Sequence, residues 1–394
     1  MKVLITLKSI DQCQKQGGVA SYFKNIRKYL EPDIEYFHFS DVPGRYLFYK
    51  AISRVRDTLK FIRICRDDKK APDIVHLNPS LGWSGLLRDA ILLKVAVRSG
   101  RKTIVFFRGW NKDIENKISS NRLVYNLFYH GFKSADAFVV LSSKFGNKLR
   151  EWHLNQPIYI ETTTVDPSLP EKVSSIRKTK DFKGNHLLFL ARIEKEKGIF
   201  ESLHCHAILK QKFTKLEMTV AGDGDALDEV KNYVNSNGIS AVHFCGYVTG
   251  EEKAKVFAKS QIYLFPTTHG EGMPNAVLEA MAAGLPVVTR AVGGLTDFFQ
   301  DGKMGFITQS SDPVEFARLV EILLLNPKLR EQISQYNSEY ARSYFLVDNV
   351  VKRLNGIYKD VFSKNARDSS WMDYYNGDPQ ISEKTENKIR NQQV

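Results

Sequence analysis

The chain has 394 residues, of which 43% are hydrophobic and 11% aromatic, so it is not mostly disordered and has material for two packed domains. Its 57 Lys and Arg residues outnumber 44 Asp and Glu residues, which gives a net charge of +13. The four cysteines are far apart and form no C-x-x-C pair, so we expect no disulfide framework, no zinc site and a reducing cytoplasm. We expect core or strand positions for Cys13, Cys65, Cys205 and Cys245.

The N-terminal segment MKVLITL is too short for the hydrophobic region of a signal peptide and predicts a first strand. No segment approaches the roughly 18 to 20 consecutive apolar residues of a membrane helix. We therefore expect a cytoplasmic protein that does not span a bilayer.

The positive charge is concentrated in the first part of the chain. Residues 1–175 contain 29 basic and 17 acidic residues, whereas the remainder contains 28 and 27. Residues 41–70 hold nine basic and four acidic residues, interleaved with apolar ones at roughly helical spacing. This pattern fits either a solvated helix packed on its own domain or a basic surface that contacts anionic lipid on the inner face of the membrane. No nucleic-acid-binding motif is present, so we expect no nucleic-acid partner.

Short apolar runs alternate with helical patterns along the chain, as expected for parallel sheets covered on both faces. A first helix is predicted at about residues 19–30. The strands predicted before the midpoint are 2–6, 34–39, 73–77, 103–107 and 137–141, and those predicted after it are 186–190, 216–221, 242–245, 261–265, 285–289 and 305–308.

This alternation predicts an α/β protein with two doubly wound, Rossmann-like domains that face each other across a cleft. The polar stretch PEKVSSIRKTKDFKGN predicts a linker between them. The expected parts are a first domain at 1–168, the linker at 169–185, a second domain at 186–344, a helix at 345–362 that crosses back to the first domain, and a polar tail at 363–394.

The most informative stretch runs from Tyr263 to Phe299. A strand is followed by a Gly-rich loop and by the short helix AVLEAMAA, with Pro274 at a first-turn position. The free N–H groups and the positive end of such a helix suit a phosphate or pyrophosphate. Glu271 in the loop and Glu279 on the second turn can both face one ligand and accept hydrogen bonds from its hydroxyl groups.

Two further clusters follow predicted strands. Arg192 and Lys197 come after the strand 186–190 and can neutralise a diphosphate, although alone they read as two solvated cations in a charge-rich loop. Gly17 and Gly18 lie between the first strand and the first helix, where missing side chains let backbone approach a ligand. A Gly-Gly turn alone is a weak signal.

With these motifs, the sequence resembles the retaining glycosyltransferases of family four, which have the GT-B fold. The resemblance rests on QGGVASYFKNIRKYL, LARIEKEKG, VAGDGDAL, VHFCGYV and, most specifically, EGMPNAVLEAMAAGLPVV, which carries the E-x7-E motif at Glu271 and Glu279. It implies a retaining, metal-independent hexosyltransferase of bacterial polysaccharide type. The co-substrate would be a nucleotide-diphosphate sugar, with UDP favoured over GDP and no further cofactor, and the acceptor a saccharide or lipid-linked saccharide.

The resemblance implies that the domain at 1–168 is the acceptor side and that the domain at 186–344 binds the nucleotide sugar. It also implies roles for individual residues. Arg192, Lys197 and Glu271 would be catalytic, the first two holding the diphosphate. Glu279 would bind the ribose hydroxyls, and Gly18 would close the phosphate site from the opposite domain. The remaining donor-binding positions implied are Gly17, Gly222, Gly272, Met273, Pro274 and Asn275. In this family the acceptor hydroxyl is thought to attack from the face that the leaving group departs, so no enzymic nucleophile is required.

One position departs from the family pattern. Where many members have a His after the strand that reads TIVFFRGWN, this chain has Arg108, which can pair with a carboxylate or phosphate or simply anchor a loop. His76, at the end of another strand, is a second acceptor-side candidate, although a single His there is as often structural.

Several alternatives are weaker. Asp223 and Asp225 resemble a D-x-D metal motif but lie in VAGDGDAL, where the family has a phosphate- or base-side loop, and Leu227 breaks the dinucleotide fingerprint. His204, Cys205 and His206 point in different directions on a helix and suit packing rather than a metal. Two other functions stay open: a UDP-sugar 2-epimerase of the same fold, and a noncatalytic glycan- or lipid-binding module.

Overall fold

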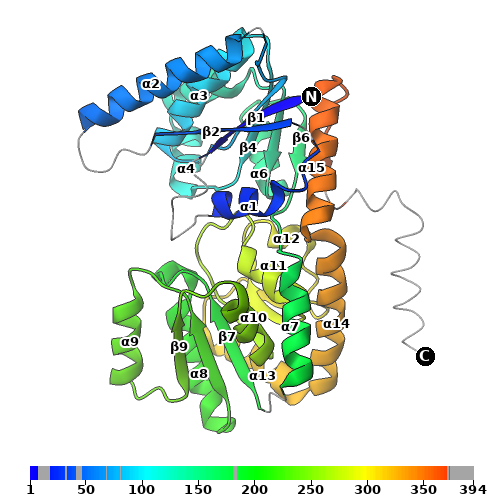
Figure 1. Ribbon diagram of the computed structural model, residues 1–394. Helices are drawn as coiled ribbons and strands as arrows, with labels where there is room; N and C mark the ends of the chain where they lie inside the picture. Colours follow the sequence, from blue (N-terminus) through cyan, green and yellow to red (C-terminus); the bar gives the residue numbers. More distant parts are fainter. Residues whose placement is uncertain are drawn as a thin grey trace. The chain divides into compact units, whose positions relative to one another are not determined.

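The computed structural model describes residues 1–7, 18–31, 33–40, 47–67, 69–79, 81–180, 184–370 and 372. They form two compact units, one built from residues 1–163 and the chain from Asp348 onward, the other from Thr164–Val347. Each unit contains a parallel sheet with helices connecting its strands, as Figure 1 shows. The predicted α/β class and its two doubly wound sheets are therefore confirmed.

The first unit contains a sheet of seven strands in the order β13-β6-β5-β4-β3-β1-β2, all paired in parallel. The central strands are rich in β-branched and aromatic residues and are buried along nearly their whole length, because helices cover both faces. The strands are β1 (Lys2–Leu7), β2 (Asp33–His38), β3 (Ile74–Leu77), β4 (Lys102–Phe107), β5 (Ala137–Val140), β6 (Ile158–Ile160) and β13 (Ser369–Ser370).

The helices of the first unit include the predicted amphipathic helix, which is α2. Its residues Phe61 and Cys65 are buried, whereas Ile52, Val55 and Leu59 are about half exposed. The part of the basic stretch at residues 41–46 lies outside the described residues. The helices are α1 (Gly18–Ile26), α2 (Leu47–Arg66), α3 (Trp83–Arg98), α4 (Lys112–Ser120), α5 (Arg122–Phe132), α6 (Ser143–Glu151) and α15 (Val347–Phe362).

The helix α15 is tied to the first unit by buried polar contacts. Arg353 Nε donates to Glu161 Oε1 at 2.8 Å, and the two side chains are 2% and 3% exposed. Farther along α15, the Tyr358 hydroxyl lies 2.7 Å from His76 Nδ1 at the end of β3. A buried pair of this kind is costly to break because either partner alone would be an uncompensated charge. The chain therefore returns to the first unit after residue 347.

The second unit contains a sheet of six parallel strands in the order β12-β11-β10-β7-β8-β9. The strands are β7 (His186–Leu190), β8 (Glu217–Ala221), β9 (Val242–Gly246), β10 (Ile262–Phe265), β11 (Val287–Arg290) and β12 (Gly305–Thr308). The helices are α7 (Ser168–Thr179), the 3-10 turn η1 (Lys195–Lys197), α8 (Ile199–Lys212), α9 (Leu227–Ser236), α10 (Gly250–Lys259), α11 (Asn275–Ala282), α12 (Leu295–Phe298), α13 (Pro313–Leu325) and α14 (Pro327–Tyr344).

The prediction of a linker at 169–185 was wrong for most of its length. Residues 168–179 form α7, which belongs to the second unit and packs against α10 (Figure 1). Leu169 and Val173 are buried, and Arg177 donates to the carbonyl oxygens of Phe257, Ala258 and Ala283. A helix that buries only a narrow apolar stripe is polar over the rest of its surface, so its composition is similar to that of a loop. The predicted tail is also partly structured, because β13 extends the first sheet.

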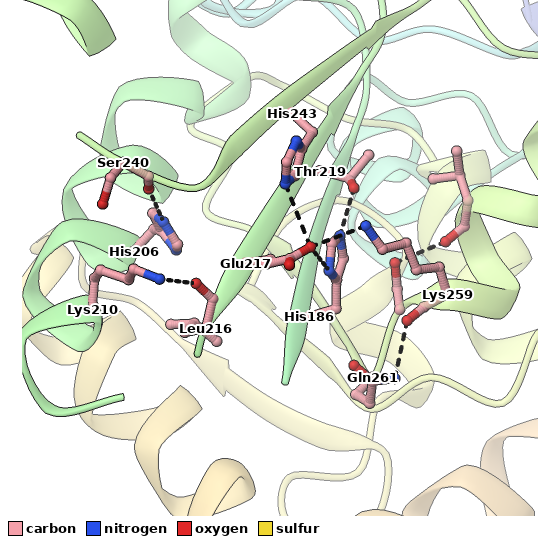
Figure 2. A network of polar contacts seen from close by, with 12 residues as sticks. His186, His206, Lys210, Leu216, Glu217, Thr219, Ser240, His243, Lys259 and Gln261 are labelled. Atoms are coloured by element: carbon pink, nitrogen blue, oxygen red, sulfur yellow. Dashed lines mark hydrogen bonds and ion pairs between the residues drawn. The ribbon is translucent and has the colours of Figure 1, made fainter. Parts of the chain in front are cut away.

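A polar cluster lies at the amino ends of β7, β8 and β9 (Figure 2). The Glu217 carboxylate accepts a hydrogen bond from Lys259 Nζ at 3.0 Å and lies 3.3 Å from His186 Nδ1 and 3.4 Å from His243 Nε2. His186 Nε2 lies 2.6 Å from Thr219 Oγ1. Burial lowers the pKa of His186 to about 4, so this imidazole is neutral at pH 7. The cluster lies at the edge opposite to the carboxyl ends of the strands.

In the sequence His204, Cys205, His206, the second and third side chains are buried. His204 is exposed and Cys205 is buried, while His206 Nε2 donates to the Ser240 carbonyl oxygen at 3.0 Å. Cys65 is buried and Cys245 lies exposed in β9, whereas Cys13 lies outside the described residues. Within the described part of the chain, no helix is long and apolar enough to cross a membrane.

Candidate functional site

The strand order of the second unit marks one edge as the place for a ligand. The chain runs outward through β7, β8 and β9, then returns to the other side of β7 with β10, so the order reverses between β7 and β10. In doubly wound sheets, ligands bind beyond the carboxyl ends of the strands at such a switch point. The loops that follow β7 and β10 contain Lys197 and Glu271, the residues singled out from the sequence.

These two loops are joined by one backbone carbonyl group. The Glu196 carbonyl oxygen accepts hydrogen bonds from the N–H groups of Thr268 at 2.8 Å and His269 at 3.0 Å. It also accepts from the hydroxyl groups of Thr267 and Thr268, at 3.1 and 3.2 Å. The turn η1 and the loop after β10 therefore form one connected wall at the switch point.

Lys197 and Glu271 meet in this wall. Lys197 Nζ lies 2.5 Å from Glu271 Oε1, and the two side chains are 8% and 14% exposed. His269 Nδ1 lies 3.8 Å from the same oxygen. The structure thus brings these two residues together, and their low exposure places an ammonium and a carboxylate where charge is only weakly screened.

Glu279 has a partner that the sequence did not reveal. Its carboxylate accepts hydrogen bonds from Lys253 Nζ at 2.9 Å on Oε1 and 3.1 Å on Oε2, and both side chains are at most one-quarter exposed. Lys253 lies in the first turns of α10, which starts at the carboxyl edge of the sheet. That position was a usable signal, because the start of every connecting helix in a doubly wound sheet lies at the ligand edge.

The charges of both carboxylates of the E-x7-E motif raise the pKa of the same buried residue. Burial raises the pKa of Tyr263 well above its usual value, and the charges of Glu279 and Glu271 raise it further. The Tyr263 hydroxyl donates to the Leu190 carbonyl oxygen at 2.9 Å, at the end of β7. Both carboxylates therefore lie close to the switch point, as the motif spacing predicted.

The helix α11 presents an open N-terminus beside this pair. It begins at Asn275, and Pro274 is its N-cap residue. The proline therefore lies one position before the helix, whereas the sequence predicted it in the first turn. No side chain caps the helix. Met273 and Pro274 are buried, while Gly272 and Asn275 are partly exposed. The N–H groups of an uncapped first turn are available to an anion.

Two glycines allow neighbouring loops to pack closely against each other. Gly222 has φ of +150°, and a Cβ there would lie 1.8 Å from the Ala191 carbonyl oxygen. Gly293 has φ of +52°, and a Cβ there would lie 2.2 Å from the Glu271 carbonyl oxygen. The sequence suggested donor binding for Gly222 and missed Gly293, whereas the structure requires both for loop packing.

Arg192 is not joined to the buried pair. Its side chain is 67% exposed and its guanidinium pairs with Glu194 at 2.7 Å. Of the two glycines predicted to approach the donor, Gly17 lies outside the described residues and Gly18 is the first residue of α1.

The acceptor-side candidates differ in burial. His76 lies in the core of the first unit, stacked on Phe106, and burial lowers its pKa to about 3, so the structure assigns it a packing role instead. Arg108 places its guanidinium 3.6 Å from the Tyr22 ring centroid and 3.8 Å from that of Phe106, and its Nε donates to Asn78 Oδ1 at 3.0 Å. Arg108 therefore stays a candidate with a fixed orientation.

Among the described residues, no group of three or more His, Cys, Asp or Glu side chains is arranged to hold a metal ion. Of the D-x-D pair, Asp223 accepts a hydrogen bond from the Gly224 N–H at 2.9 Å, and Asp225 is exposed.

Comparison with known proteins agrees with this geometry. Residues 173–340 match the family model described as Glycosyl transferases group 1. An uncharacterized glycosyltransferase of Methanocaldococcus jannaschii, MJ1069, is 28% identical over 59% of this chain and 59% of its own. The capsular polysaccharide biosynthesis glycosyltransferase CapM of Staphylococcus aureus is 27% identical over 43% and 44%. The chain thus spans about half the length of the curated relatives it matches.

Solved structures resemble the whole described fold. HepE from Anabaena, in complex with UDP and glucose, has a TM-score of 0.69 at 17% identity and covers 91% of this chain and 99% of its own. Sucrose-phosphate synthase from Thermosynechococcus elongatus has a TM-score of 0.72 at 14% identity, over 92% and 99%. At such identity the likeness establishes the fold, which is GT-B. Over residues 173–340, the chain is similar to the group 1 glycosyltransferases.

Proposed function

We propose that the chain transfers a hexosyl group from a nucleotide-diphosphate sugar, UDP favoured over GDP, to a hydroxyl of a saccharide or lipid-linked saccharide in cell-surface polysaccharide biosynthesis. The observation that carries this proposal is the buried Lys197–Glu271 pair at the switch point, next to the open N-terminus of α11. HepE binding UDP and the polysaccharide role of CapM support the donor and the pathway class.

The chemistry follows from the groups present. Breaking a glycosyl–phosphate bond leaves negative charge on the diphosphate, which the Lys197 ammonium and the N–H groups of α11 stabilise. Arg192, which is 67% exposed and pairs with Glu194, supplies a second cation. Glu279, oriented by Lys253, accepts hydrogen bonds from ribose hydroxyls.

In the proposed mechanism, Glu271 and the backbone of residues 272–275 contact the transferred sugar. The acceptor hydroxyl attacks from the leaving-group face and gives its proton to the departing phosphate, so configuration is retained without an enzymic nucleophile or a metal. Arg108 binds a polar or anionic group on the acceptor side.

We place the protein in the cytoplasm, in peripheral contact with the anionic inner face of the membrane through the basic first part of the chain. The excess of cations at residues 1–175 supports that contact. A UDP-sugar 2-epimerase shares the fold but needs an acid–base pair for elimination. The Glu271 and Glu279 carboxylates at the switch point are each paired with a lysine, which favours binding over proton transfer.

Thermal-shift measurements with UDP, GDP and ADP test the donor. A ligand bound only by the folded state at 100 times its Kd stabilises it by about 2.7 kcal/mol. We expect the melting temperature to rise most with UDP, and transfer assays with UDP-sugars to give a product that depends on added acceptor. Release of free UDP with a 2-epimeric sugar and no acceptor would instead indicate the epimerase. Absence of any nucleotide-dependent shift would indicate a noncatalytic module.

A further inference from the structure

Two helices of the first unit expose apolar side chains that its sheet does not bury. Trp83, Leu87 and Ile91 follow one another at four-residue intervals along α3 and are 37%, 45% and 53% exposed. Leu123 and Leu127 do the same on α5, at 80% and 54%. Residues four apart share one side of a helix, so each helix carries an apolar stripe facing outward. We call these five residues the α3–α5 surface.

The helices α3 and α5 pack against each other, and a hollow of about 120 Å³ lies at their junction. Its walls are formed by residues of the α3–α5 surface together with buried neighbours such as Leu86, Phe128 and Phe132. Among the described residues that line it, Lys94 is the one with a charged side chain. A contiguous apolar surface with a hollow in it marks a place where a protein meets a hydrophobic partner.

The exposed charges of α2, α3 and α5 favour an anionic partner, whereas the adjoining α4 exposes both signs, at Lys112, Asp113 and Lys117. The exposed charged residues of α3 and α5 are cations, namely Lys94, Arg98 and Arg122. The acidic residue of α3, Asp89, is fully buried and held by Arg88 at 2.8 and 3.0 Å. The adjoining helix α2, which packs on α3, exposes further cations at Arg54, Arg56, Lys60 and Arg63.

We propose that the α3–α5 surface docks on an anionic lipid bilayer, with Trp83 and the leucine and isoleucine side chains entering the boundary of the hydrocarbon region. Apolar insertion and attraction of Lys or Arg to anionic headgroups add together in such contacts, and tryptophan favours the interface. A protein partner would have to supply a matching acidic rim. The inference rests on the proposed function in one respect, that a lipid-linked acceptor is present in the same bilayer.

The test uses the full chain with vesicles of phosphatidylcholine, with and without phosphatidylglycerol. The variant Leu87→Gln/Ile91→Gln/Leu127→Gln changes three exposed side chains, so its melting temperature is expected to match that of the wild type. We expect it to bind anionic vesicles about 10-fold more weakly or worse, because the apolar contribution is lost. The matched control is Val55→Gln/Leu59→Gln, whose residues are 60% and 51% exposed on α2 and which we expect to bind within about 2-fold of the wild type.

A second readout locates the inserted side chain. Brominated lipids are expected to quench the fluorescence of the wild type more than that of Trp83→Phe. Unchanged vesicle binding by the α3–α5 variant, or loss confined to the α2 variant, would overturn the proposal. So would a stable dimer of the wild type that the α3–α5 variant abolishes. UDP binding measured on the same variants is expected to be unchanged. Failure of UDP to bind any of them would refute the proposed function. Vesicle binding would still test the α3–α5 surface in that case.

Discussion

Replacing Lys197 with methionine is expected to lower kcat/KM for sugar transfer by about 10²- to 10³-fold, the usual effect of removing one group that stabilises charge in the transition state. Lys197 is the buried cation at the switch point, so solvent cannot replace it easily. The matched control is Lys195→Met, on the same turn, whose side chain is 60% exposed and pairs with Glu229. We expect that control to stay within about 2-fold of the wild type.

The free energy of unfolding of the Lys197 variant separates a catalytic effect from a structural one. Lys197→Met leaves the Glu271 carboxylate buried without its cation, so the free energy of unfolding is expected to fall by about 3 to 5 kcal/mol. Adding Glu271→Gln removes that charge and is expected to restore most of the stability but none of the activity. Recovery of activity in the double variant would mean that Lys197 serves only to neutralise Glu271.

Replacing Glu279 with glutamine is expected to weaken UDP binding by about 10-fold or more, because hydrogen bonds from hydroxyls to a charged acceptor are worth about 1.5 to 3 kcal/mol. Titration calorimetry with UDP and 2′-deoxy-UDP checks the ribose contact. The wild type should prefer UDP, and Glu279→Gln should bind the two nucleotides almost equally. An unchanged preference would place the ribose elsewhere.

Lys253→Met should act through the same contact, raising KM for the donor with little change in kcat. A double-mutant cycle of Lys253→Met and Glu279→Gln is expected to give a coupling energy of about 1 to 3 kcal/mol for UDP binding. Lys255→Met is the matched control, since Lys255 lies two residues away on α10 and pairs with Glu252 in solvent. Additive effects at Lys253 and Glu279 would show that the lysine does not position the carboxylate.

What the sequence could predict depends on how local each feature is. The long apolar strands and the loop-helix corner around Glu271 and Glu279 lie within short continuous segments, so their periodicity and spacing were sufficient. The strands β6 and β13 were missed because three residues and two residues carry too little pattern. The helix α7 was missed because its stabilising contacts come from α10, far along the chain.

In the candidate site, too, local features could be predicted and contacts that depend on packing could not. Lys197 and Glu271 are 74 residues apart, yet both follow strands that parallel-sheet topology brings together. The contact between Lys253 and Glu279 joins two helices and depends on their packing, which no spacing in the sequence encodes. For His76, a strand-end position suggested the acceptor side, but the hydroxyl of Tyr358, from a helix 282 residues later, completes its burial.

The proposed function requires a nucleotide diphosphate to bind at the β7–β10 switch point of the second unit. Hydrogen–deuterium exchange of the full chain with saturating UDP tests this directly, because binding slows exchange of the amides it orders. We expect protection to be concentrated in residues 190–198 and 266–282, with Lys197→Met reducing it. Protection confined to other segments, with these two unchanged, would contradict the assignment of the site.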